Sequence, residues 1–113
     1  MSYIIYHNPR CSKSRETLEL LRENKISPII VEYLEHPFSE KEIKTLLKKL
    51  DMSATELIRK KESLIKEKKL DITTEEKAIE ALSLYPKLVE RPIVVKGNKA
   101  VLGRPPENVK KLF

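Results

Sequence analysis

The chain has 113 residues, a net charge of +6 and 35% charged residues. This length suits one domain that buries its core without disulfide or metal staples. A single cysteine excludes an internal disulfide, the paired-cysteine zinc spacings and a C-x-x-C redox pair, because position 14 is Ser. The chain does not open on a leader-like stretch and lacks any apolar run of about 18 residues. We therefore expect a soluble protein of a reducing compartment, the cytoplasm, with no membrane partner.

The positive charge suits an anionic small molecule or an acidic partner. Lysines are spread along the expected helices, and only two Phe are present, so stacking platforms for nucleic acid are scarce. The basic run at 59–69 is interrupted by Glu62 and Glu67, and alternating charges are typical of a solvated helix face. We therefore expect no nucleic-acid partner.

The first elements are a strand at about 3–6, a helix at about 12–24 and a second strand at 29–33. The first strand is the apolar, β-prone run Tyr3-Ile4-Ile5-Tyr6, while Asn24 and Pro28 mark the end of the helix and the start of the second strand. Two strands separated by a helix of this length form a βαβ unit, whose crossover makes the strands parallel.

Cys11 lies in the turn that joins the first strand to the first helix, within the sequence HNPRCSKSR at 7–15. The N-terminus of a helix has unpaired N–H groups and a partial positive charge, which favour a thiolate and can also hold an oxyanion. A lone cysteine is often core filler, but Pro, Arg, Ser and Lys are not core neighbours. We therefore interpret Cys11 as a reactive thiol.

The middle of the chain, at about 38–85, has helical patterns only, and we interpret it as an insertion in a single domain that spans 1–113. Three capping boxes begin its helices: Ser39 with Glu42, Ser53 with Glu56, and Thr73 with Glu76. A strand at 91–96, a Gly97-Asn98 turn, a strand at 99–102 and a short final helix follow. The order βαβ, helices, ββα predicts an α/β fold with a four-stranded mixed sheet and helices on its faces.

Four further side chains could act with the thiol. Arginine offers an oxyanion a planar fork of donors, and Arg59, Arg91 and Arg104 all lie near expected chain turns, although each alone is more simply a surface residue. Arg91 precedes a proline that opens a strand, which makes this bond a candidate cis peptide. His7 has three possible roles: an ion pair with the thiolate, a hydrogen bond that orients the turn, or pairing with backbone groups at the strand end. The sequence contains no ligand cluster for a metal.

These residues resemble the active-site turn of the glutaredoxin-coupled arsenate reductases, which have a thioredoxin-like fold with a helical insertion. The resemblance rests on HNPRCSKSR at 7–15 with Thr17-Leu18, and it extends through 33–35, 57–60, 90–95 and 103–106. The pattern H-N-P-x-C-x-x-S-R, followed by three arginines in order, is specific, and it covers essentially the whole chain.

The resemblance implies that Cys11 attacks arsenate, that glutathione then joins the arsenic as co-substrate, and that glutaredoxin removes the glutathione so that arsenite is released. It implies that Arg59, Arg91 and Arg104 hold the oxyanion, that His7 favours the thiolate, and that Ser14 and Arg15 are turn residues of the binding site. We also expect no bound cofactor or metal, and a monomer. The alternatives are a glutathione-dependent thiol-redox protein and a redox-sensing regulator on the same fold; Ser14 replaces the second cysteine that such regulators use.

Overall fold

The computed structural model describes residues 2–113. Its contacts divide the chain into two compact units. The first unit holds the chain up to His36 together with Arg91–Phe113, and the second is Pro37–Glu90. The first unit contains the sheet and the second only helices and short turns, and each is described separately below.

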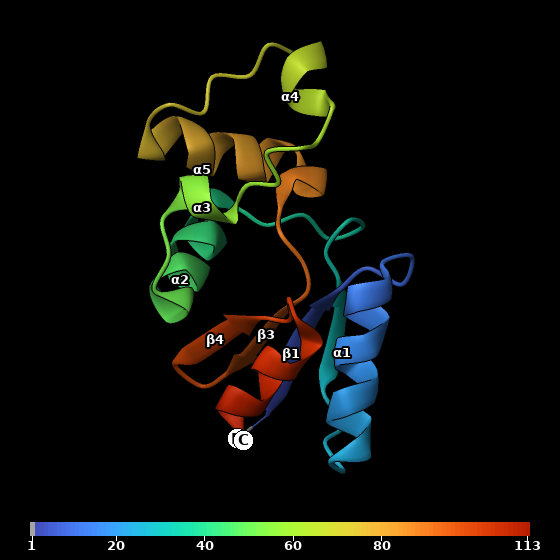
Figure 1. Cartoon of the computed structure of the whole chain (residues 1–113). Helices are drawn as coiled ribbons and strands as arrows, with labels where there is room; N and C mark the ends of the chain where they lie inside the picture. Colours follow the sequence, from blue (N-terminus) through green and yellow to red (C-terminus); the bar gives the residue numbers. More distant parts are fainter. Residues whose placement is uncertain (1) are drawn as a thin grey trace. The chain divides into compact units, whose positions relative to one another are not determined.

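The first unit is built on a four-stranded mixed sheet in the order β2-β1-β3-β4 (Figure 1). Its strands are β1 (Tyr3–His7), β2 (Ile29–Glu32), β3 (Ile93–Lys96) and β4 (Lys99–Leu102). The β1 and β2 strands are parallel, and both β1–β3 and β3–β4 are antiparallel. The predicted βαβ and ββα parts and the mixed sheet are therefore confirmed. Because β1 and β2 are parallel with His7 opposite Glu32, the residues that follow both strands emerge at the same edge of the sheet.

Helix α1 (Ser12–Glu23) and the 3-10 helix η2 (Pro106–Leu112) pack against each other and against the sheet. The core that they share contains side chains from β1, α1, β3 and η2: Ile5, Leu18, Leu21, Val94, Val109 and Leu112. These positions follow the spacing of one helix face and the alternation of a strand, which is the pattern from which the elements were predicted. The final helix has 3-10 geometry, a detail that the sequence pattern did not predict.

Two glycines serve the ββα part in different ways. Gly97 has a φ of 60° in the turn between β3 and β4, a conformation that glycine adopts without steric cost. Gly103, at the end of β4, is a close-packing position: a Cβ there would lie 2.7 Å from Cγ of Pro92 and also collide with Thr17 of α1. Thr17 donates from Oγ1 to the carbonyl oxygens of Lys13 (2.8 Å) and Gly103 (3.3 Å), so α1 is tied to the end of β4.

The second unit contains α2 (Glu40–Leu50), α3 (Ala54–Leu57), α4 (Leu64–Glu67), α5 (Glu75–Leu84) and the 3-10 turn η1 (Pro86–Leu88). Its core lies mainly between α2, α3 and α5. The capping boxes predicted at Ser39 and Ser53 are both present, with reciprocal side-chain and backbone hydrogen bonds. No helix of residues 2–113 is long and apolar enough to cross a membrane.

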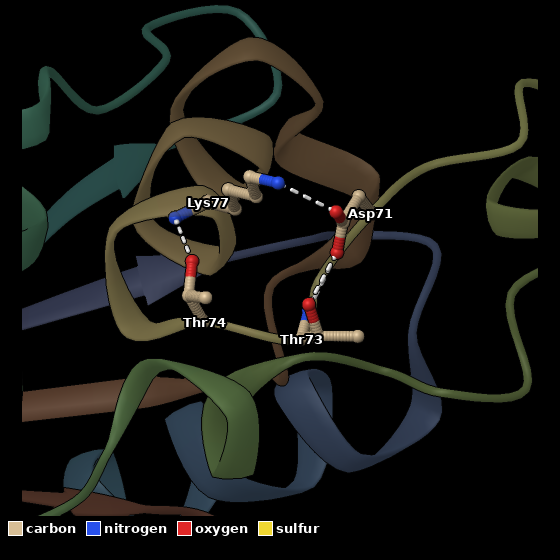
Figure 2. Close-up of polar contacts among 4 residues, drawn as sticks. All are labelled: Asp71, Thr73, Thr74 and Lys77. Atoms are coloured by element: carbon tan, nitrogen blue, oxygen red, sulfur yellow. Dashed lines mark hydrogen bonds and ion pairs between the residues drawn. The ribbon is translucent and has the colours of Figure 1, made fainter.

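The capping box predicted at Thr73 is wrong by one residue. The N-cap of α5 is Thr74, whose Oγ1 accepts from the N–H of Lys77 (3.2 Å) (Figure 2). Thr73 instead donates from its N–H and its hydroxyl to Asp71, and Lys77 Nζ approaches the same carboxylate at 2.7 Å. Thr73 therefore forms a local turn with Asp71 instead of capping α5 as the sequence pattern had predicted.

Candidate active site

Cys11 is the N-cap residue of α1. Its backbone is extended, with φ of −94° and ψ of 122°, and its N–H donates to the carbonyl oxygen of Asn8 at 3.0 Å. At this position Ser, Thr or Asp commonly accepts from the N–H groups of the first turn. The Cys11 side chain makes no such cap hydrogen bond, but the first turn of α1 contains no acidic residue that would repel a thiolate at this position.

The surroundings of Cys11 favour the ionised thiol. Burial of the side chain raises the pKa of Cys11, but hydrogen bonds from the Ser14 N–H and the Arg91 side chain, the positive charge of Arg91 and the Lys13 N–H together outweigh it. The pKa of the thiol therefore lies below its ordinary value. Nucleophilic cysteines have this combination of helix N-terminus and nearby cation.

His7 and Ser14 form a buried pair behind the thiol. The Nδ1 atom of His7 lies 2.6 Å from Oγ of Ser14, and the same Oγ accepts from the N–H of Asn8 at 3.1 Å. Burial lowers the pKa of His7; Glu32 opposes this shift, and Arg22 and Arg15 add to it. A neutral imidazole that hydrogen-bonds to Ser14 favours the second of the three roles considered for His7, in which it orients the turn. The Ser14 side chain is engaged on this side, while its N–H supports the thiolate.

Arg91 is the arginine that the structure brings to Cys11. It follows the second unit in the chain and precedes β3, and its bond to Pro92 is cis, as the sequence suggested. The half-buried guanidinium stabilises the thiolate by a hydrogen bond and by its charge. Its Nε is fully buried, with no hydrogen-bond partner among residues 2–113. A buried donor without an acceptor is costly, and an oxygen of an anion would satisfy this one.

Arg104 and Arg15 hold other parts of the same edge together. Nη1 of Arg104 donates to the carbonyl oxygen of Arg91 at 3.2 Å, and the Arg104–Pro105 bond is also cis. Nη1 of Arg15 donates to the carbonyl oxygen of Pro9 at 3.0 Å, across the active-site turn. Both guanidinium groups are exposed, and each fixes backbone near the thiol through one of its nitrogens.

Arg59 belongs to the other unit. Its Nε lies 3.5 Å from Oε1 of Glu90, and both side chains are about three-quarters buried. The backbone of this segment is fixed by two hydrogen bonds, from Arg59 N to Leu88 O (2.7 Å) and from Glu90 N to Leu57 O (2.9 Å). The role of Arg59 toward an oxyanion stays a prediction.

Two residues of the site were not singled out from the sequence. Asn8 is buried; its Oδ1 accepts from the N–H of Arg10 at 3.0 Å, and its carbonyl oxygen accepts from Cys11. Tyr33, which directly follows β2, is only 1% exposed and interacts with Arg91, Cys11 and Asn8. The signal available for Tyr33 was its place after a parallel strand, at the same edge as the turn that follows β1. Among residues 2–113, no cluster of His, Cys, Asp or Glu could hold a metal ion.

The fold defines a thioredoxin-like protein whose single thiol, with a lowered pKa, lies at the start of a helix. The profile of the ArsC family matches residues 6–112. An arsenate reductase of Haemophilus influenzae is 46% identical over 112 residues, which cover 96% of this chain and 97% of that protein. The Escherichia coli protein YfgD, which is described as uncharacterized, is 56% identical over 93% of this chain and 91% of its own length. An arsenate reductase from Vibrio cholerae has a solved structure with a TM-score of 0.94 and 45% identity, covering 100% of this chain and 98% of that one. The chain therefore belongs to the ArsC family.

Proposed function

We propose that this protein is an arsenate reductase that uses Cys11 as its nucleophile and glutathione as its reductant. The observation that carries the proposal is a thiol of lowered pKa beside Arg91, whose fully buried Nε has no hydrogen-bond partner among residues 2–113. The thiolate supplies the nucleophile, and the guanidinium supplies a donor for an oxyanion. The similarity to arsenate reductases at 44% to 46% identity supports arsenate as that oxyanion.

The first step is substitution at arsenic. The Cys11 thiolate attacks arsenate, an S–As bond forms, and one As–O bond breaks with the oxygen leaving as water after protonation. Arg91 neutralises charge on the remaining oxygens, and the first turn of α1 offers further N–H donors. In this proposal Arg59 and Arg104 complete the oxyanion site, and the pair formed by His7 and Ser14, with Arg15, holds the turn in place.

The reduction needs two electrons, which this chain with its single cysteine does not supply alone. In the proposed cycle one glutathione joins the arsenic of the Cys11 adduct and displaces an oxygen. Glutaredoxin then takes this glutathione as a mixed disulfide, which leaves trivalent arsenic on Cys11, and water releases arsenite and the free thiol. A second glutathione regenerates glutaredoxin and forms glutathione disulfide. Arsenate and two glutathiones thus give arsenite, glutathione disulfide and water, with no cofactor bound to the protein, which acts as a cytoplasmic monomer.

The decisive experiment measures arsenate-dependent NADPH consumption with glutathione, glutaredoxin and glutathione reductase supplied. Wild type and Cys11→Ser are compared, and each component is omitted in turn. Turnover by wild type that disappears in Cys11→Ser, or without glutaredoxin, supports the proposal. Turnover that continues without glutathione would refute the proposed electron source.

A second candidate function shares the same thiol. A cysteine with a lowered pKa at a helix N-terminus also suits exchange with glutathione disulfide. That function predicts rapid glutathionylation of Cys11 and NADPH consumption that arsenate does not accelerate. The same coupled assay therefore separates the two.

A further inference from the structure

Tyr33 is the large polar side chain of this site to which no role has yet been given. It is only 1% exposed and lies at the edge of the sheet where β1 and β2 end together. The side chains of Arg91 and Asn8 both lower the pKa of its phenol, and the charge of a Cys11 thiolate raises it, so all three groups lie near the phenol. Tyr33 therefore shares Arg91 with the nucleophile.

The phenol remains protonated while the thiol ionises. The pKa of Tyr33 is raised to about 12, mainly by burial and also by the charge of a Cys11 thiolate, while Arg91 and Asn8 act in the opposite direction. A phenol in this state is a permanent O–H donor near neutral pH.

The second observation is the buried Nε of Arg91, which has no partner among residues 2–113. The Nε–H of the Arg91 guanidinium and the O–H of the Tyr33 phenol are thus two donors near Cys11. A tetrahedral oxyanion presents several acceptor oxygens and pairs with donors of both kinds.

We propose that Tyr33 is a substrate-binding residue of the site, whose phenol O–H donates to an oxygen of the tetrahedral oxyanion held by Arg91 and attacked by Cys11. This inference rests on the proposed function and extends it. Charged groups alone attract any anion, whereas a neutral donor at a fixed place favours one position and orientation of the oxyanion. Tyr33 would therefore orient arsenate for attack and leave the reactivity of the thiol itself unchanged.

The test compares Tyr33→Phe with wild type. The change removes the hydroxyl and keeps the ring that fills the buried space. Tyr3→Phe is the matched control, because the Tyr3 hydroxyl donates to Leu112 O (3.2 Å), away from the active-site turn. Two quantities are measured for each protein: the pH dependence of Cys11 alkylation by iodoacetamide, and the arsenate concentration that protects Cys11 from alkylation without glutathione.

We expect arsenate protection to weaken roughly tenfold or more in Tyr33→Phe, as for the loss of a hydrogen bond to a charged group, while the alkylation midpoint stays in place. Equal protection in Tyr33→Phe and wild type would overturn the role of Tyr33 and leave the proposed function standing. A shifted midpoint that accounts for the weaker protection would also overturn it, because Tyr33 would then act through the thiol. Absence of protection in wild type would refute arsenate binding and the inference with it.

A measurement on a protein that keeps Tyr33 guards against misfolding of Tyr33→Phe. Tyrosine is labelled with carbon-13 at Cζ, and arsenate is titrated into Cys11→Ser, which binds without forming the adduct. The Tyr33 signal should shift along the binding curve while the Tyr3 signal stays fixed. A Tyr33 signal that does not move at saturating arsenate would contradict direct contact.

Discussion

Replacement of Gly103 by alanine tests how tightly the active-site edge is packed. The φ of Gly103 is not in the left-handed region, so alanine can adopt its backbone conformation, and the expected effect is purely steric. The added Cβ would lie 2.7 Å from Pro92 Cγ and 3.0 Å from Thr17 Cγ2, well inside normal contact. Overpacking of this kind costs about 1–3 kcal/mol, and the loss of glycine's freedom in the unfolded chain returns about 0.4–1 kcal/mol. A net loss on the order of 1–2 kcal/mol should lower Tm by roughly 4–8 °C.

The assay is urea or thermal unfolding of Gly103→Ala, Thr17→Ala and the double variant. Thr17→Ala removes both Thr17 atoms that the new Cβ would meet and leaves the contact with Pro92. The double variant should therefore be more stable than the sum of the single effects predicts, by about 0.5 kcal/mol or more. Wild-type stability of Gly103→Ala, or strict additivity, would refute the steric argument. Because Arg104 follows Gly103 and donates to Arg91 O, the same change should also reduce arsenate turnover.

Three further predictions concern charge. Arg91→Gln removes a donor and a cation beside the thiolate, so the pKa of Cys11 should rise and alkylation near neutral pH should slow; an unchanged pH profile would contradict the assignment. Glu90→Gln releases Arg59, and if Arg59 binds the oxyanion the KM for arsenate should fall a few-fold, because such a pair contributes about 1 kcal/mol or less; Glu90→Asp, which keeps the charge, should not lower it. Burial lowers the pKa of His7, so the unfolded chain binds the proton more readily, and stability to urea should fall as the pH drops below about 6.5. His7→Asn should flatten that dependence, and an equally steep dependence in the variant would exclude His7 as its source.

The parts of the fold that the sequence predicted are those with a strong local signal. The alternation of the strands, the helix face of α1 and two capping boxes each bring apolar or capping groups together within a few residues, and all three are present. The cap of α5 was misplaced because Asp71 offered Thr73 a competing turn, which a spacing rule does not detect. The ArsC family membership was predicted from the combination of the turn and the later arginines, and the comparisons confirm it.

The site was less predictable, because its contacts join residues that lie far apart in the sequence. The residues next to Cys11 in the sequence were enough to suggest a reactive thiol. The meeting of Arg91 and Tyr33 beside it depends on β3 pairing with β1 and on β2 ending at the same edge as β1. No pattern within the segments around 33 or 91 contains this information, and only the sheet topology provides it.

The chemistry of Cys11 depends on its surroundings and also on the absence of a second cysteine from the sequence. Position 14, where a second cysteine would complete a C-x-x-C pair, holds a serine whose hydroxyl is engaged with His7 and Asn8. Replacement of Ser14 by cysteine would remove the hydroxyl that accepts from the N–H of Asn8. It would also place a second thiol on the residue whose backbone N–H lowers the pKa of Cys11. The Ser14 side chain is thus held within the turn, and Cys11 is the one thiol of the sequence. Under the proposed function, the thiol that resolves a Cys11 adduct therefore comes from outside the chain, whichever oxyanion Cys11 attacks.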